Sequence, residues 1–272
     1  MLLALLLGLW RAPAWANSPA PDSYGGRDML VDVPARLPPI GRRALVVVLH
    51  GGLGNAERIA SGRSESALNM DSVAERDGFI VAYLDGTPVT RFLGARMLGW
   101  NAGGGCCGQS AANDVDDVAY IEGAVDYLAT KYGVDRRRVF AIGHSNGAMM
   151  AQRLICQSNL LAAAVAISGP LNLDVSRCPA AAGKRILAIH GADDQNVPLA
   201  GGVGPRGLSR IAYKSEDRSR RVLAGSGASY TLQVVPGADH RLDHIEAAIV
   251  HSEGVTIAQK AAGFFGLTQP RP

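Results

Sequence analysis

The stretch RRVFAIGHSNGAMMAQRL, residues 137–154, joins a strand-like apolar run to a helical pattern at a single serine. Gly143 and Gly147 lie two residues before and after Ser145, although glycine weakens both strands and helices. A G-x-S-x-G pattern at such a junction predicts a turn too sharp for bulky neighbours. The turn projects the serine from the carboxyl end of the strand, where the following helix N-terminus stabilises developing negative charge. Ser145 is therefore predicted to be a nucleophile.

The rest of the chain alternates strand-like and helical patterns. Strand-like runs occupy residues 44–50, 79–85, 138–145, 162–169, 185–191 and 230–237, with helices expected over 117–133, 146–156 and 255–265. The runs at 44–50 and 79–85 are continuously apolar, as in strands buried on both faces. This order predicts an α/β fold, with a mostly parallel sheet covered by helices on both faces. Residues 28–34 are expected to form an antiparallel edge strand. Residues 200–229 are expected to be an excursion with a short helix within 208–223.

A serine hydroxyl needs a base to take its proton, and the base needs an acid to orient it. In α/β chains with this turn, the order is serine, acid, histidine. His240 follows the last predicted strand and is the preferred base, with His244 as the alternative. His190 precedes the acid and is predicted to be structural, and His251 is predicted to be exposed.

The acid is expected in the loop after the strand at 185–191, where Asp193 and Asp194 are adjacent. Asp194 begins a D-x-x-V-P pattern that is common at this turn in serine hydrolases, so it is the predicted acid. Asp193 is expected to be a loop or capping residue.

Two backbone N–H groups should bind the oxyanion of an acyl-transfer intermediate. One is predicted to belong to Asn146, directly after the serine. The other is assigned to Gly52 in LHGGLGNA (49–56), where glycines let the backbone approach a substrate closely. This loop contains neither G-x-G-x-x-G nor G-K-[ST], so it does not match a phosphate-binding loop.

Several segments together resemble the exported polyhydroxybutyrate depolymerase-like and feruloyl esterase-like α/β-hydrolases: LHGGLGNA, GFIVAYLDGT, GWNAGGGCCG, residues 115–156 and HGADDQNVP. The resemblance covers about residues 25–200. It implies an α/β-hydrolase fold and cofactor-free hydrolysis of esters of hydroxy acids, hydroxycinnamates or acetylated sugars. Ser145, Asp194 and His240 match that family's triad, and Gly52 its oxyanion position. Residues 200–240 lack the G-G-G-H-x-W-P ending frequent in the family, which weakens the substrate assignment more than the triad.

The loop GWNAGGGCCG (99–108) lies beside the active site in those relatives. Trp100 is accordingly predicted to bind substrate, with a core position as an equal alternative. The three aspartates of NDVDDV (113–118) suit the start of a helix better than a calcium site. No histidine and cysteine set has zinc spacing, so no metal is predicted.

The amino-terminal segment predicts export. Residues 1–16 combine a short apolar run with a small-x-small cleavage pattern at Ala14–Ala16, as in a signal peptide. Residues 17–272 are then one secreted or periplasmic catalytic domain without a stable membrane anchor, and disulfides are allowed. Four cysteines allow three pairings. Adjacent Cα atoms lie about 3.8 Å apart, below the usual disulfide range, so a Cys106–Cys107 bridge would be strained. Cys156–Cys178, which closes a modest loop, is the favoured pair.

The predicted function is therefore a serine esterase that works through an acyl-enzyme on small or oligomeric esters. An acyltransferase using the same triad and a non-catalytic exported binding protein are the alternatives. The net charge is only +3 and the basic residues are scattered, so a nucleic-acid partner is not expected.

Overall fold

The computed structural model describes residues 19–61, 67–89, 97–207 and 209–268. The predicted signal peptide at residues 1–16 lies outside these residues. Among the described helices, none is long and apolar enough to cross a membrane.

An eight-stranded sheet forms the centre of the molecule, with the strand order β1-β2-β4-β3-β7-β8-β9-β12. The six strands from β4 to β12 are parallel, and only β1 and β2 run antiparallel to their neighbours. The strands of the main sheet are β1 (Ala20–Tyr24), β2 (Arg27–Asp32), β3 (Arg43–Leu49), β4 (Ile80–Leu84), β7 (Val134–His144), β8 (Ala163–Ile167), β9 (Arg185–Gly191) and β12 (Ser229–Val235). Two small sheets pair β5 (Thr87–Pro88) with β6 (Leu98–Gly99) and β10 (Gly202–Val203) with β11 (Ala212–Tyr213).

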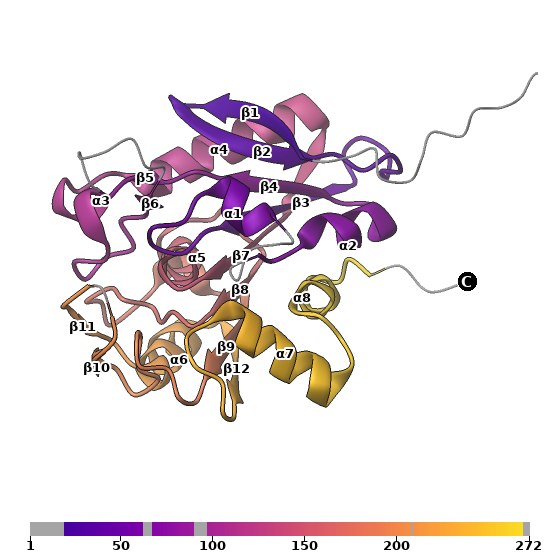
Figure 1. The fold of residues 1–272 in the computed structure, drawn as a ribbon. Coiled ribbons are helices and arrows are strands. Elements are labelled where there is room, and N and C mark those ends of the chain that lie inside the picture. Colours follow the sequence, from indigo (N-terminus) through magenta and orange to yellow (C-terminus); the bar gives the residue numbers. More distant parts are fainter. Residues whose placement is uncertain (1–18, 62–66, 90–96, 208, 269–272) are drawn as a thin grey trace, which may run out of the picture.

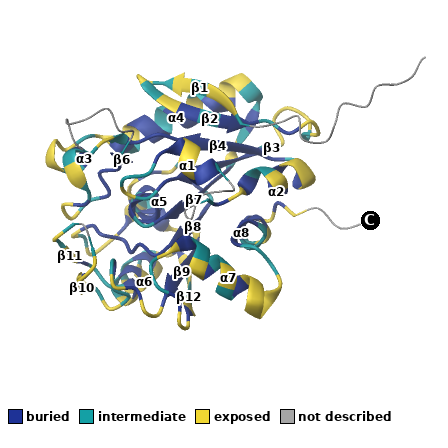
Figure 2. Cartoon of the chain, viewed as in Figure 1, coloured by how far each residue is buried: buried dark blue, intermediate teal, exposed yellow. Residues whose placement is uncertain are grey.

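Helices cover both faces of the sheet. They are α1 (Ala56–Ala60), α2 (Met70–Asp77), α3 (Gly108–Ala112), α4 (Asp117–Tyr132), α5 (Asn146–Gln157), α6 (Glu216–Gly225), α7 (Leu242–Glu253), α8 (Ile257–Phe265) and the 3₁₀ turn η1 (Pro179–Ala181). One apolar core lies between the sheet and α4, α5 and α6, and a second core lies between the opposite face and α1, α2, α7 and α8. Figure 2 shows the central strands β3, β4 and β8 largely buried, as their apolar sequences require.

The predicted fold class is confirmed, with two corrections of detail. Residues 27–32 form a strand between β1 and β4, so the edge of the sheet is β1. The error arose because the polar sequence of β1, Ala20–Tyr24, carries little strand signal. The helix expected within 208–223 begins later, at Glu216, where Ser215 caps its first turn.

The structure joins Cys156 to Cys178, the favoured pair. Cys156 lies in the last turn of α5, and Cys178 precedes η1. Both residues are fully buried in the core beneath α5. The bond therefore ties the end of the helix that follows Ser145 to the segment beyond β8.

Replacing both cysteines, Cys156→Ala with Cys178→Ala, should lower the free energy of unfolding by about 2–4 kcal/mol, because the unfolded chain gains the entropy of a 22-residue loop. Chemical denaturation would measure the loss. Activity at low temperature should survive. An unchanged free energy of unfolding would show that this bond does not constrain the unfolded chain.

Candidate active site

Ser145 lies at the junction of β7 and α5, with a backbone φ of 56°. A left-handed φ is uncommon outside glycine and marks a strained turn. The flanking glycines allow it. A Cβ on Gly143 would lie 2.4 Å from the carbonyl of Gly147, and a Cβ on Gly147 would lie 2.1 Å from the carbonyl oxygen of Leu49. Any larger side chain would push β3, β7 and α5 apart.

A continuous hydrogen-bond relay begins at this serine. Ser145 Oγ lies 2.9 Å from His240 Nε2, and His240 Nδ1 lies 2.7 Å from Asp194 Oδ2. The second carboxylate oxygen, Asp194 Oδ1, accepts hydrogen bonds of 2.8 Å from the backbone N–H groups of Asn196 and Val197. These two bonds fix the carboxylate in the geometry that orients His240.

The topology explains why residues nearly 100 positions apart meet. Ser145 follows β7, Asp194 follows β9, and the loop with His240 follows β12. These strands are parallel, so their carboxyl ends lie at one edge of the sheet. Ligand sites of open parallel sheets form at this edge.

The charges of the relay suit proton transfer from Ser145. Burial raises the pKa of Asp194, but hydrogen bonds from His190 and His240 outweigh burial and hold this pKa well below its ordinary value. Asp194 is therefore an anion at neutral pH. Burial and the nearby His240 lower the pKa of His144 to about 3, so His144 is neutral. Its Nε2 lies 2.9 Å from the carbonyl oxygen of His240 and supports the backbone of that loop.

The glycine loop after β3 lies beside the serine. A Cβ on Gly51 would touch Ser145 Cβ at 3.4 Å, and a Cβ on Gly52 would lie 3.8 Å from Asn146 Cβ. The N–H groups of Leu53 and Gly54 donate to backbone carbonyls, so neither is the oxyanion donor, and Gly52 stays the candidate donor of this loop. Asn146 is the first residue of α5, where a backbone N–H has no acceptor within the helix.

The structure places Trp100 in the core, the alternative to a substrate-binding position. Its side chain is fully buried, and its indole Nε1–H donates to the carbonyl oxygen of His50 at 3.0 Å. The Trp100 backbone N–H and carbonyl bind the side-chain amide of Asn146 at 2.7 and 3.0 Å. Trp100 therefore braces the two segments that carry the candidate oxyanion donors. A lone tryptophan among glycines does not by itself distinguish a core position from a position in the substrate-binding wall.

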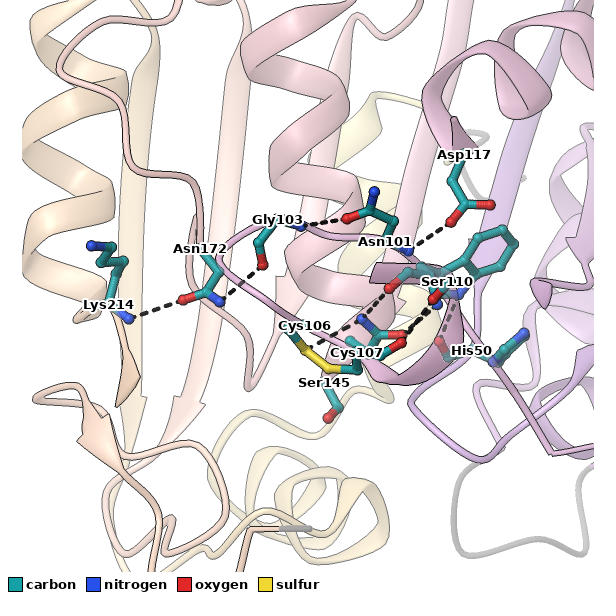
Figure 3. The surroundings of a disulfide bond; sticks show 12 residues. His50, Asn101, Gly103, Cys106, Cys107, Ser110, Asp117, Ser145, Asn172 and Lys214 are labelled. Atoms are coloured by element: carbon teal, nitrogen blue, oxygen red, sulfur yellow. Dashed lines mark hydrogen bonds between the residues drawn. A yellow bond between two sulfur atoms is a disulfide. The ribbon is translucent and has the colours of Figure 1, made fainter. Parts of the chain in front are cut away.

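Cys106 and Cys107 form a second disulfide, contrary to the expectation from their spacing. That expectation assumed a trans peptide, whereas the peptide between them is cis. Figure 3 shows the pair close to Ser145, within a loop held by Asn101, Gly103 and Asn172. Cys107 lines the cavity in front of the serine, and Cys106 Sγ lies 3.6 Å from Asn146 Nδ2.

A cavity of about 520 Å³ opens onto Ser145 and His240. The glycine loop 51–54 forms part of its lining, together with Val89, Cys107, Tyr213 and Leu242. A volume of this order is typical of sites for small organic ligands. Apolar surface beside a reactive serine suits the acyl or alcohol part of an ester.

The other histidines and aspartates that the sequence offered for the site lie outside the relay of Ser145, His240 and Asp194. His244 is half exposed and contacts Asp239 at 3.0 Å, and His251 is exposed on α7. Asp193 is exposed. Asp116 caps α4, and Asp117 binds Arg27 and the backbone N–H of Asn101. Within the described ranges, no group of three histidine, cysteine or acidic side chains could hold a metal ion.

Sequence reasoning missed one contact of the site. His190, interpreted as structural, lies with Nε2 3.2 Å from Asp194 Oδ2, the same oxygen that contacts His240. Its Nδ1 lies 3.0 Å from Glu216 Oε1 in α6. Chain order cannot reveal the contact with Glu216, because it depends on where α6 lies relative to the end of β9.

Fold and site together define an α/β-hydrolase with a serine, histidine and aspartate in relay. Solved structures similar to this chain include a carboxylesterase from Bacillus cereus (TM-score 0.59, 17% identity, 89% of this chain and 94% of that one) and an acetyl xylan esterase from Aspergillus awamori (TM-score 0.58, 17%, 89% and 95%). A likeness at this identity shows the fold.

Residues 38–244 match the phospholipase/carboxylesterase family, and the chain therefore belongs to this family of carboxylic ester hydrolases. Relatives include feruloyl esterase B of Piromyces equi (29% identical over 65% of this chain and 31% of that protein) and a probable feruloyl esterase C of Aspergillus clavatus (26%, 72% and 64%). A bifunctional acetylxylan esterase/xylanase of Neocallimastix patriciarum is 26% identical over 64% of this chain. The chain spans 31% of the length of feruloyl esterase B and 42% of the length of a further relative, the esterase NocK of Nocardia uniformis.

Proposed function

We propose that this chain hydrolyses carboxylic esters through an acyl-enzyme, with Ser145 as nucleophile. The observation that carries the proposal is the relay of 2.9 and 2.7 Å from Ser145 through His240 to Asp194 at the floor of a cavity. Distances of this size allow His240 to take the serine proton as the ester carbonyl is attacked.

In the proposed reaction, Ser145 Oγ attacks the carbonyl carbon and its proton passes to His240 Nε2. The backbone N–H groups of Gly52 and Asn146 donate to the oxyanion. Collapse of the intermediate transfers the proton from His240 to the departing alcohol. Water then attacks the acyl-enzyme with His240 as the base, and Ser145 is regenerated. Asp194 remains ionised throughout and stabilises the imidazolium.

The proposed substrates are esters of hydroxycinnamates, acetylated sugars or hydroxyalkanoate oligomers. The names of the fungal relatives support the first two classes. We also propose that residues 17–272 form one exported catalytic domain. The paired state of all four cysteines supports this, because structural disulfides persist in oxidising compartments.

Initial rates on methyl ferulate, acetylated xylo-oligosaccharide and 3-hydroxybutyrate trimer should show turnover of at least one ester. EDTA should leave that rate unchanged, because the proposed mechanism uses no metal. Addition of an alcohol acceptor distinguishes hydrolysis from acyl transfer, since a transferase would form the new ester in preference to the free acid. Failure to turn over any ester, together with no labelling of Ser145 by an organophosphate, would contradict the proposal.

A further inference from the structure

His190 lies at the end of β9, fully buried behind the candidate triad. The carboxylate of Asp194 lies between two imidazoles. His240 Nδ1 contacts Asp194 Oδ2 at 2.7 Å, and His190 Nε2 contacts the same oxygen at 3.2 Å. His190 therefore acts on the oxygen atom that orients the candidate base.

Both ring nitrogens of His190 face acceptors. Nδ1 lies 3.0 Å from Glu216 Oε1, and Nε2 lies 2.8 Å from the carbonyl oxygen of Val197 as well as 3.2 Å from Asp194. A neutral imidazole has one N–H and one lone pair. In either tautomer that lone pair would point at a carboxylate or carbonyl oxygen in the dry interior. With both carboxylates ionised, only the imidazolium, with two N–H groups, satisfies every contact.

The electrostatics agree with this geometry. Burial lowers the pKa of His190, but hydrogen bonds to Asp194 and Glu216 outweigh burial and raise the pKa to about 10. A group with a raised pKa holds its proton throughout the neutral range. This direction agrees with the contacts of His190, which place its two ring nitrogens against two carboxylates.

The surroundings maintain this charge. Glu216, from α6, is 1% exposed, and its second oxygen accepts a 2.6 Å hydrogen bond from the hydroxyl of Tyr230 in β12. Two further titratable groups face this cluster, His144 from β7 and Tyr213 from β11, and both respond electrostatically to its charges. His144 is neutral, and burial raises the pKa of Tyr213, so neither adds a charge at neutral pH.

We propose that His190 is a positioning residue, a permanently protonated imidazolium that holds Asp194 ionised and in place and extends activity towards acidic pH. The inference rests on the proposed triad. The positive charge of His190 beside Asp194 weakens the stabilisation that this carboxylate gives to a protonated His240. His240 then becomes available as a base at lower pH than it would with Asp194 alone.

The charge state can be read directly by NMR of the ¹⁵N-histidine-labelled protein. Of the six histidines, His190 should carry hydrogen on both ring nitrogens at every pH from 6 to 8. A neutral His190 ring anywhere in this range would overturn the inference. This measurement needs no esterase activity, so it stands even if the proposed function fails.

The effect on the pH profile can be tested with charge-matched variants. The double variant His190→Gln with Glu216→Gln removes the cation and its far anion together, so the net charge of the buried cluster stays the same. The acid limb of kcat/KM for 4-nitrophenyl acetate should move up by about one pH unit, because the closer of the two removed charges is positive. Glu216→Gln alone should move the acid limb of kcat/KM to lower pH or leave it at the same pH. His251→Gln, an exposed change on α7, serves as the control and should match the wild type.

A merely structural role predicts a different pattern. The double variant would then lose activity by the same factor at every pH, and the acid limb would stay where it is in the wild type. That result overturns the proposal. If the double variant fails to fold, the charge state of His190 in the unmodified protein and the response to Glu216→Gln still decide it.

Discussion

Ser145→Ala is expected to reduce kcat by about 10⁴-fold or more while leaving the fold intact. Alanine keeps the Cβ that Ser145 already places at a φ of 56°, so the turn between β7 and α5 gains no new strain. Loss of Oγ removes the atom that would form the acyl-enzyme, and His240 then has no hydroxyl to deprotonate. Steady-state kinetics on the best ester of the panel would measure the loss.

A matched serine change controls for this result. Ser252 is exposed on α7, away from the cavity, and Ser252→Ala should keep wild-type kinetics. Thermal unfolding of both variants would show that neither has lost its fold. Retention of a tenth or more of the wild-type kcat by Ser145→Ala would exclude Ser145 as the nucleophile.

His240→Ala is expected to be about as damaging as the loss of Ser145, whereas His244→Ala should change kcat by less than about threefold. Triad members act as a unit, so removal of the base abolishes most of the effect of the nucleophile. His240 bridges Ser145 and Asp194 at 2.9 and 2.7 Å. His244 lies one turn into α7, half exposed, against Asp239.

The two histidines make a direct comparison, because the same substitution is made four residues apart in one segment. The double variant Ser145→Ala with His240→Ala should be no slower than either single variant. The opposite ranking, with His244→Ala inactive and His240→Ala active, would assign the base to His244. It would also require a different placement of the loop after β12.

Much of this molecule follows from short-range sequence patterns. Unbroken apolar runs predicted β3 and β4, because strands buried on both faces need no alternation. Shorter strand-like runs predicted β7, β8, β9 and β12. Gly143 and Gly147 predicted the turn at Ser145, because only glycine avoids the 2.1–2.4 Å contacts found there. The order of serine, acid and histidine then led to Asp194 and His240, which the structure brings together. Each inference depends on neighbours within a few residues, where the chain itself limits the geometry.

The tertiary structure decided what depends on contacts between distant segments. Trp100 is buried because β3 and α5 supply hydrogen-bond partners for its indole and its backbone. Cys106 pairs with Cys107, although the spacing of adjacent residues argued against that bridge. The contacts of His190 depend on α6 bringing Glu216 to the end of β9. The sequence by itself determined which residues could do chemistry and in what order they follow one another. The packing of strand ends and loops decided which of them touch, because hydrogen bonds over 2.7–3.2 Å depend on the relative placement of whole elements.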